Sequence, residues 1–305
     1  MSLSVSVIIP TRDRAEALCE CLDALAGQTM DVSAFEVVVV DDGSEVPVEI
    51  GGGRRNGGMA VRVIRQENAG PGAARNRGVA EARGRLVVFT DDDCRPRPEW
   101  LAELTGAIEA GGGGVLAGGV TENGLPGIPG STVSQLIIDL VYEHFNADAE
   151  ASRFFASNNM ACEREAYLAV GGFDERFRLA SEDRDLCDRW LGSGRRLVQV
   201  EGARVVHGHE QTLMAFTRLH FRYGRGASMY RRMRAGRGGN GMGADLGFHR
   251  KLPGRVWRRL RGERWGRVLV VVGLLVWWEV VNAAGFFWEE WRSRGVKGSG
   301  VDTGG

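Results

Sequence analysis

The sequence predicts an α/β protein built on a mostly parallel sheet with helices on both faces. Short apolar segments alternate with amphipathic ones through the first hundred residues, which is the rhythm of β-α units. The apolar segments are short and rich in β-branched residues, as buried strands are. Several of them end in polar or acidic residues, as strands do at the ligand edge of an α/β sheet. A long apolar segment near residue 280 predicts an additional C-terminal helix.

The first half of the chain predicts four strands, at 5–9, 35–40, 61–64 and 86–90. Asp13 and Glu16 form the pattern of a capping box before a helix with an apolar face. A short helix is expected at 73–82. Another helix begins near Pro98, because proline suits the first turn of a helix.

After the glycine run at 111–114 the alternation becomes less regular. A strand is expected at 115–120, and a strand or a hairpin at 197–206; the expected helices are 131–145, 163–170, 181–191 and 211–233. Gly171 and Gly172 end the second of these helices, and Ser181 is a candidate cap for the third. Residues 234–245 are rich in Gly and Arg, so we expect a mobile loop or linker there.

The apolar segment 268–288 is about long enough to span a bilayer. About a dozen strongly apolar residues contribute roughly −0.3 to −0.6 kcal/mol each, and the charge of Glu279 costs a few kcal/mol. Arginines and tryptophans surround the segment and suit an anionic cytoplasmic leaflet. We expect a membrane-associated helix that either crosses the bilayer or lies flat on it. A packing helix or a dimer interface is the alternative.

Composition narrows the class of protein. The 305 residues carry a formal net charge of zero, which argues against a general nucleic-acid-binding protein. The five cysteines lack metal-type spacing and are expected to be free thiols in a reducing compartment. The apolar run 5–9 is too short for a secretory signal. These features indicate a cytoplasmic catalytic or binding domain.

Three consecutive carboxylates, Asp91, Asp92 and Asp93, follow the strand at 86–90. Like charges in such a row repel one another, and a divalent cation with a phosphate ligand would resolve the conflict. The alternative is an exposed acidic turn that caps the following helix. The sequence therefore makes this strand end a candidate metal and phosphate site.

Two other strands also end in polar side chains, and parallel strands bring these ends to one edge of the sheet. Asp41 and Asp42 are candidates to bind a base or ribose, although Asp-Gly-Ser is also common turn chemistry. Arg14 and Arg75 are candidates to face phosphates, because arginine recognises them well. The three strand ends together predict a single crevice.

At this point the chain resembles the family 2 glycosyltransferases, which share the GT-A fold. The matching motifs, in chain order, are Val-Ser-Val-Ile-Ile-Pro-Thr at 5–11, Val-Val-Val-Asp-Asp-Gly-Ser at 38–44, Asn-Ala-Gly-Pro-Gly-Ala-Ala-Arg-Asn at 68–76, Phe-Thr-Asp-Asp-Asp at 89–93, Gly-Gly-Phe-Asp-Glu at 171–175 and Ser-Glu-Asp-Arg-Asp at 181–185. The resemblance implies a GT-A-type, Rossmann-like sheet and a nucleotide-diphosphate sugar donor, with a UDP-sugar favoured. It also implies a divalent metal, Mn²⁺ or Mg²⁺.

The resemblance also implies roles for individual residues. The implied donor-binding residues are Pro10, Thr11, Arg14, Asp41, Asp42, Arg75, Asp91, Asp92 and Asn159. Asp91 and Asp93 match the family's Asp-X-Asp motif and are the expected metal ligands, together with His207. His209 is the alternative to His207 as the third ligand.

Catalysis requires a base, because the acceptor hydroxyl must lose its proton as it attacks the anomeric carbon. Glu182 and Asp183 look like the family's acidic pair, with Asp183 as the base and Glu182 orienting it or touching the acceptor. One base and direct displacement would invert the anomeric configuration. The alternative is that these acids only stabilise the start of a helix.

The implied organisation is a glycosyltransferase domain at 1–230, with a donor half at about 1–115 and an acceptor half at about 116–230. A basic linker at 231–267, a hydrophobic helix at 268–291 and a flexible tail at 292–305 follow. The Gln-X-X-Arg-Trp motif of processive synthases is absent, so we expect a non-processive enzyme of cell-envelope or glycoconjugate synthesis, at the inner face of the cell membrane. Its acceptor is a carbohydrate or a lipid-linked molecule, and no nucleic-acid partner is expected.

Three other functions are alternatives. The first is a nucleotide-sugar-binding protein that has lost transfer activity, and the intact acids at 42, 91, 93 and 183 argue against it. A haloacid-dehalogenase-like phosphatase would need Asp-X-Asp-X-Thr or Val, which residues 91–95 do not supply. A nucleic-acid-binding module on the Arg-rich segment would bind with a steep salt dependence.

Overall fold

The computed structural model describes residues 4–50, 57–239 and 243–298. The chain forms two compact units. The first consists of Met1–Leu125, Tyr142–Arg178 and Glu182–His209, and the second of Pro126–Val141, Leu179–Ser181 and Glu210–Gly305. The domain boundaries expected from the sequence remain predictions.

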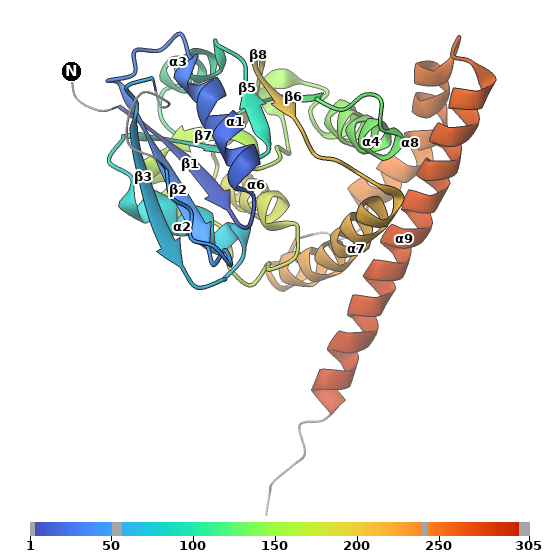
Figure 1. The fold of residues 1–305 in the computed structure, drawn as a ribbon. Coiled ribbons are helices and arrows are strands. Elements are labelled where there is room, and N and C mark those ends of the chain that lie inside the picture. The colour runs from blue at the N-terminus through green and yellow to red at the C-terminus, as the bar shows by residue number, and fades with distance from the viewer. Residues whose placement is uncertain (1–3, 51–56, 240–242, 299–305) are drawn as a thin grey trace, which may run out of the picture. The chain divides into compact units, whose positions relative to one another are not determined.

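The first unit contains a mixed sheet of the order β3-β2-β1-β4-β7-β6-β8-β5 among the described residues (Figure 1). The strands are β1 (Val5–Thr11), β2 (Phe35–Asp42), β3 (Ala60–Gln66), β4 (Leu86–Thr90), β5 (Cys94–Pro96), β6 (Val115–Asn123), β7 (Asn159–Glu163) and β8 (Arg196–His207). The four strands from β3 to β4 are parallel, and β6 is parallel to β8. β7 is antiparallel to both neighbours, and β5 is antiparallel to β8.

Helices cover both faces of this sheet. They are α1 (Ala15–Ala26), α2 (Pro71–Glu81), α3 (Trp100–Gly111), α5 (Arg164–Val170) and α6 (Glu182–Gly192), with a 3₁₀ turn at Ala149–Ala151. Alternate residues of β1 point to opposite faces. Val7 belongs to the core formed with α1 and α3, whereas Ile8 lies against Gly78 of α2. The predicted α/β architecture is thereby confirmed.

Local details differ from the sequence predictions at two strands and one cap. β5 and β7 were not predicted, because neither segment has the β-branched run of a buried strand. The capping box expected at Asp13 and Glu16 does not form, since Arg14 is the residue at the N-cap and makes no side-chain cap. Asp13 instead has a positive φ of 55° and accepts a hydrogen bond from the backbone N–H of Glu45.

The second unit is helical. It contains α4 (Pro129–Phe145) up to Val141, α7 (Leu213–Gly236), α8 (Gly243–Leu260) and α9 (Trp265–Gly298). Its core consists of Val133, Ile137, Leu140, Phe216, Phe248, Leu252, Val271, Leu275 and Trp278.

Residues 231–267, which were expected to form a basic linker, contain the end of α7 and all of α8. α8 is a packed helix because Phe248 and Leu252 lie one turn apart and are buried together in the core. The tail expected from residue 292 is helical to Gly298, and residues 299–305 lie outside the described part. Within the described residues, one helix is long and apolar enough to cross a membrane, at Trp265–Arg294.

Candidate functional site

The three carboxylates after β4 are held by residues from the end of β1. The hydroxyl of Thr11 donates to Oδ2 of Asp92 at 2.7 Å. Nη1 of Arg14 lies 2.8 Å from Oδ2 of Asp93 and 3.2 Å from Oδ1 of Asp92. β1 and β4 are neighbouring parallel strands, so their carboxyl ends meet at one edge. The structure thus brings these predicted site residues together, and Pro10 lies buried beside them in β1.

The neighbouring carboxylates of this cluster have different electrostatic environments. Burial raises the pKa of Asp92 to about 6, against the opposing effects of Thr11 and Arg14. Burial also acts on Asp93, but His207 and Arg14 outweigh it and hold the pKa of Asp93 below its ordinary value. Asp93 therefore keeps its negative charge to a lower pH than Asp92 does.

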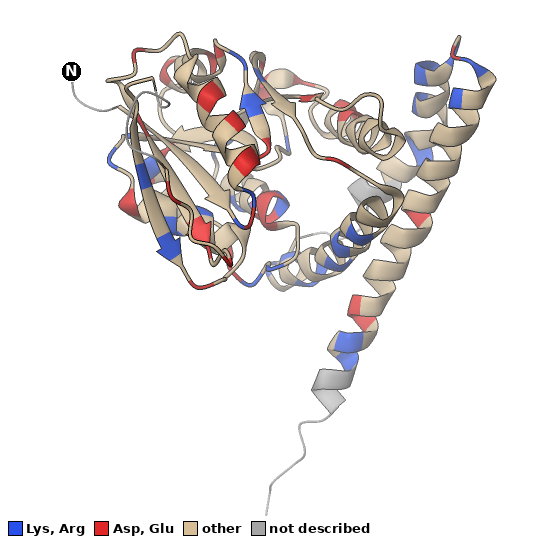
Figure 2. Cartoon of the chain, in the orientation of Figure 1, with Lys and Arg blue, Asp and Glu red and all other residues tan. Residues whose placement is uncertain are grey.

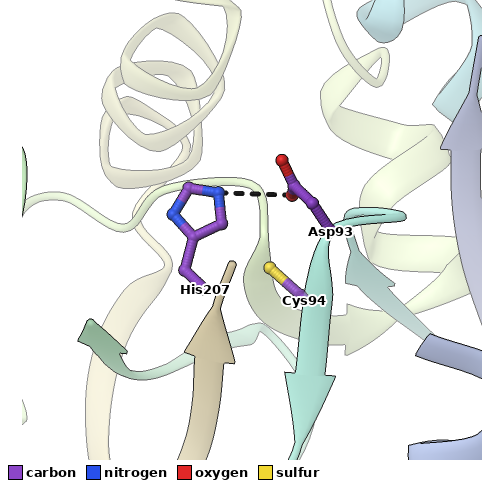
Figure 3. Close-up of side chains that lie close together, drawn as sticks. All are labelled: Asp93, Cys94 and His207. Atoms are coloured by element: carbon purple, nitrogen blue, oxygen red, sulfur yellow. Dashed lines mark ion pairs between the residues drawn. The ribbon is translucent and has the colours of Figure 1, made fainter. Parts of the chain in front are cut away.

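Asp93, Cys94 and His207 form a cluster of potential ligand atoms that lie within 4.8 Å of one another (Figure 3). β5 pairs with β8 so that Cys94 stands opposite His207. Nε2 of His207 lies 3.2 Å from Oδ1 of Asp93. The sequence analysis did not include Cys94 in the site, although it directly follows Asp93.

These residues fit a divalent ion of the Mn²⁺ or Mg²⁺ type. Oδ1 of Asp93 is buried and makes no hydrogen bond among the described residues, so a ligand oxygen is available beside an imidazole nitrogen. A carboxylate with an imidazole suits Mn²⁺. Burial raises the pKa of the Cys94 thiol well above its ordinary value. Mn²⁺ and Mg²⁺ prefer oxygen ligands to soft thiolate, so Asp93 is the better candidate ligand of the two.

The alternative ligand His209 lies close to His207, with ring centroids 5.4 Å apart. Burial lowers the pKa of His209, whereas the adjacent Asp93 raises that of His207 against the effect of burial. His207 approaches Asp93 directly, at 3.2 Å, and its role as the metal ligand, with His209 as the alternative, stays a prediction.

Arg75 connects the acidic cluster to the second acidic pair. Its guanidinium is buried, with Nη2 at 2.6 Å from Oδ1 of Asp91 and Nη1 at 3.4 Å from Oε1 of Glu182. The same group lies over the ring of Phe173, 5.5 Å from the centroid. The sequence analysis placed Arg75 against phosphates, whereas in the structure its charge faces two carboxylates. Its contact with the donor remains a prediction.

Asp183 lies in the first turn of α6 and is half-buried. Burial, followed by the negative charge of Glu182, raises its pKa to about 7. A carboxylate with this pKa suits a general base at neutral pH. Ser181, the expected helix cap, has a positive φ of 77° immediately before α6, a conformation that costs energy in a residue with a side chain and is often found at functional sites.

The carboxylate of Asp42 forms hydrogen bonds with the loop that precedes α2. Its Oδ1 accepts hydrogen bonds from Nε2 of Gln66 at 2.8 Å and from the N–H of Ala69 at 2.9 Å. Its Oδ2 accepts from Nδ2 of Asn68 and from the N–H of Gly70, both at 2.9 Å. Asp42 therefore fixes the shape of this loop, and its contact with a nucleoside remains a prediction.

Asp41 is likewise bound by its own chain. Its carboxylate accepts hydrogen bonds from the N–H groups of Ser44 at 2.8 Å and Val48 at 3.2 Å. Arg65 lies 3.5 Å away. Asp41 thus organises the turn after β2, which is the turn chemistry that the sequence analysis kept as an alternative.

Asn159 has another role than the substrate contact expected from the sequence. It is fully buried, and its Oδ1 accepts a hydrogen bond from Nε1 of Trp100 at 2.8 Å. Its Nδ2 donates to the carbonyl oxygens of Val120 and Ala203 at 3.1 and 3.0 Å. The side chain joins three strands and one helix, so it is not placed to contact a sugar.

Comparisons with known proteins identify the family of this chain. The family model for glycosyl transferase family 2 matches residues 6–170. The glycosyltransferase AglE of Haloferax volcanii is 36% identical over 121 residues, which is 38% of this chain and 39% of that protein. The pre-mycofactocin glycosyltransferase of Mycobacterium tuberculosis is 30% identical over 236 residues, 68% of this chain and 43% of that protein. The matched regions thus span about two fifths of these relatives.

Solved structures share the fold at low sequence identity. The mannosyltransferase PcManGT from Pyrobaculum calidifontis, in complex with GDP-Man and Mn²⁺, has a TM-score of 0.66 at 17% identity and covers 96% of this chain and 88% of its own. TarS of S. aureus (1–349) in complex with UDP-GlcNAc has a TM-score of 0.54 at 20% identity, covering 73% and 65%. The sheet, the strand-end site and the family match together show that this chain belongs to glycosyl transferase family 2.

Proposed function

We propose that this chain transfers a sugar from a nucleotide-diphosphate sugar to an acceptor hydroxyl, with inversion at the anomeric carbon. The observation that carries the proposal is the double contact of Arg75 with Asp91 and Glu182. This contact supports the proposal, because Asp91, a candidate metal ligand, and Glu182, the neighbour of the candidate base Asp183, lie on the same guanidinium. An inverting transferase needs the diphosphate site and the base on opposite sides of one reacting carbon.

On the donor side, Asp93 and His207 would hold Mn²⁺ or Mg²⁺, with Asp91 as a further ligand. A bound ion would stabilise the charge that develops on the departing diphosphate. Thr11 and Arg14 would position the donor from the end of β1. The related structures of PcManGT with GDP-Man and Mn²⁺ and of TarS with UDP-GlcNAc support a nucleotide-sugar donor, and we favour a UDP-sugar.

On the acceptor side, Asp183 would accept the proton of the attacking hydroxyl. Its pKa of about 7 leaves a substantial deprotonated fraction at neutral pH. Glu182 holds Arg75 and maintains the raised pKa of its neighbour. A single base acting in one displacement gives inversion.

The cellular setting is part of the same proposal. The apolar helix α9 supports work at a membrane, on the cytoplasmic side, with a carbohydrate or lipid-linked acceptor. Transfer of one sugar per event, in cell-envelope or glycoconjugate synthesis, follows from the absence of a processive motif in the sequence.

The test is the variant Asp183→Asn, assayed by release of nucleotide from the donor and by donor binding. We expect loss of about 10²–10⁴-fold in turnover with donor binding retained. Asp188→Asn, in the same helix α6, is the matched control and should keep its activity. Loss of donor binding in a folded Asp183→Asn protein would contradict the base assignment. Wild-type protein that binds the donor but transfers nothing would instead support a binding protein.

A further inference from the structure

One face of α9 is apolar and exposed along nearly the whole helix. Its residues recur every three or four positions, which places them on one side of the helix. This outer face consists of Trp265, Leu269, Val272, Val276, Val280, Phe287 and Trp291, which are between 41% and 75% exposed. Trp277 and Trp288 flank it and are also exposed.

The opposite face of α9 is packed within the second unit. Val271, Leu275 and Trp278 belong to its core. Further along, the backbones of α7 and α9 approach so closely that a Cβ added at Gly224 would lie 1.9 Å from the carbonyl oxygen of Asn282. The two helices are therefore in direct contact.

Ion pairs extend this contact toward the C-terminal end of α9. Nε of Arg225 lies 2.8 Å from Oε2 of Glu289. The hydroxyl of Ser228 donates to Oε1 of Glu290 at 2.8 Å, and Arg232 lies 3.3 Å from the same oxygen. α9 is thus attached to α7 by both apolar and polar contacts.

This attachment decides between the two modes of membrane association that the sequence left open. α7 (Leu213–Gly236) contains six arginines and no acidic residue, and Figure 2 shows these basic positions along the helix. If α9 crossed a bilayer with residues 268–288 in the hydrocarbon, the first half of α7 would enter with it, because Nε1 of Trp277 donates to the hydroxyl of Thr217 and Gly224 meets the backbone of Asn282. That half carries Arg218 and Arg222, and one arginine at the bilayer centre offsets about six apolar side chains, so these two would cancel most of the gain from the apolar face of α9.

The charges near α9 suit an anionic surface. Residues 250–267, which precede or begin α9, contain eight basic residues and one acidic residue. Within the apolar part of α9, the carboxylate of Glu279 lies 2.9 Å from Nδ1 of His249, so it has a polar partner inside the unit. A basic segment beside an apolar, tryptophan-bearing face is the pattern of a helix that lies in the membrane interface.

We propose that α9 lies flat on an anionic membrane, with the outer face inserted at the boundary between headgroups and acyl chains. The basic residues 250–267 would then face lipid phosphates. The inference deepens the membrane location in the proposed function and does not depend on sugar transfer. It commits to a lipid surface, because a second copy of this chain would bring the same basic segments together.

The depth of the outer face in a bilayer tests this proposal. Cys19 is the exposed residue among the free cysteines of the described chain, so Cys19→Ser gives a background for labelling. Leu269→Cys, Val276→Cys and Phe287→Cys, each carrying a fluorescent label, are bound to vesicles of phosphatidylcholine and phosphatidylglycerol. Nitroxide-labelled lipids then quench from a shallow or a deep acyl position.

A flat helix predicts stronger quenching by the shallow nitroxide at all three positions, about 5–10 Å below the surface. A crossing helix predicts stronger quenching of Val276→Cys by the deep nitroxide, since the middle of the helix would reach the bilayer centre. That result would overturn the proposal.

A binding experiment separates lipid from protein partners. The double variant Leu269→Gln and Val276→Gln should weaken sedimentation with anionic vesicles by at least about tenfold. Val46→Gln replaces a side chain that is 79% exposed in the first unit, and should leave vesicle binding unchanged. Unaltered binding of the double variant, or a stable dimer without affinity for vesicles, would contradict the proposal. Donor binding measured in the same samples reports separately on the proposed enzyme.

Discussion

Replacement of Glu182 by glutamine should move the acid limb of the pH–rate profile to lower pH. A general base must be deprotonated, so the rate rises with pH through its pKa. Burial and then the charge of Glu182 raise the pKa of Asp183 from an ordinary 3.8 to about 7. Glu182→Gln removes the negative charge beside Asp183 but leaves Asp183 buried.

The size of the effect is bounded by the structure. The raised pKa corresponds to about 4 kcal/mol in favour of the neutral carboxyl, at about 1.4 kcal/mol per pH unit. Because burial remains, the midpoint of the variant should lie between 3.8 and about 7. Arg75 loses one of its two carboxylate partners, and its positive charge then stabilises ionised Asp183 further, in the same direction.

The assay is nucleotide release by hydrolysis of the donor, which requires no known acceptor, measured between about pH 5 and 9 and scaled to the plateau rate. At pH 6 a base of pKa about 7 is roughly one tenth deprotonated, so the wild type should run at about a tenth of its plateau. Glu182→Gln should retain a larger fraction at that pH. Glu182→Asp, which keeps the charge, should resemble the wild type. An active Glu182→Gln enzyme with an unchanged or higher midpoint would refute the reasoning.

Two further predictions concern the fold that supports the site. Asn159→Leu should lower the free energy of unfolding by roughly 3 kcal/mol in urea titration, because it leaves Nε1 of Trp100 and two carbonyl oxygens without partners; a loss below about 1 kcal/mol would contradict the structural role of Asn159. Gly78→Ala should destabilise by about 1–3 kcal/mol, since the added Cβ would lie 2.4 Å from Cγ2 of Ile8. The control is Gly106→Ala in α3, where no atom lies within 4 Å of the new Cβ. This variant should be neutral or slightly stabilising. Equal shifts of the melting temperature in the two variants would contradict the packing of α2 on the sheet.

Much of the first unit could be predicted because its signals are local. The parallel strands β1, β2 and β4 are apolar runs with no competing pattern, and their ends carry the residues of the site. β7 (Asn159–Glu163) contains no β-branched residue and lies between antiparallel partners far away in the sequence, so no local pattern marks it. α8 was hidden by its glycines and arginines and by Pro253, while the spacing of Phe248 and Leu252 was its one helical signal.

The site also combines features that local sequence patterns predict with features that depend on tertiary structure. The gathering of Thr11, Arg14 and the carboxylates after β4 follows from strand order, which the sequence pattern implies. The partner of each polar group depends on tertiary structure instead. The side chain of Arg75 contacts two carboxylates, and that of Asn159 bonds to backbone carbonyl groups. These partners are distant in the sequence, so no local pattern predicts them.

The central claim is a metal-dependent nucleotide site at the ends of β1 and β4. Calorimetric titration of the protein with UDP, GDP, CDP and dTDP, each with Mn²⁺ and again with EDTA, tests it most directly. We expect one nucleotide to bind in the presence of Mn²⁺ and to lose that binding in EDTA and in the variant Asp93→Ala. Binding of no nucleotide, or binding that persists in EDTA and in Asp93→Ala, would contradict the claim.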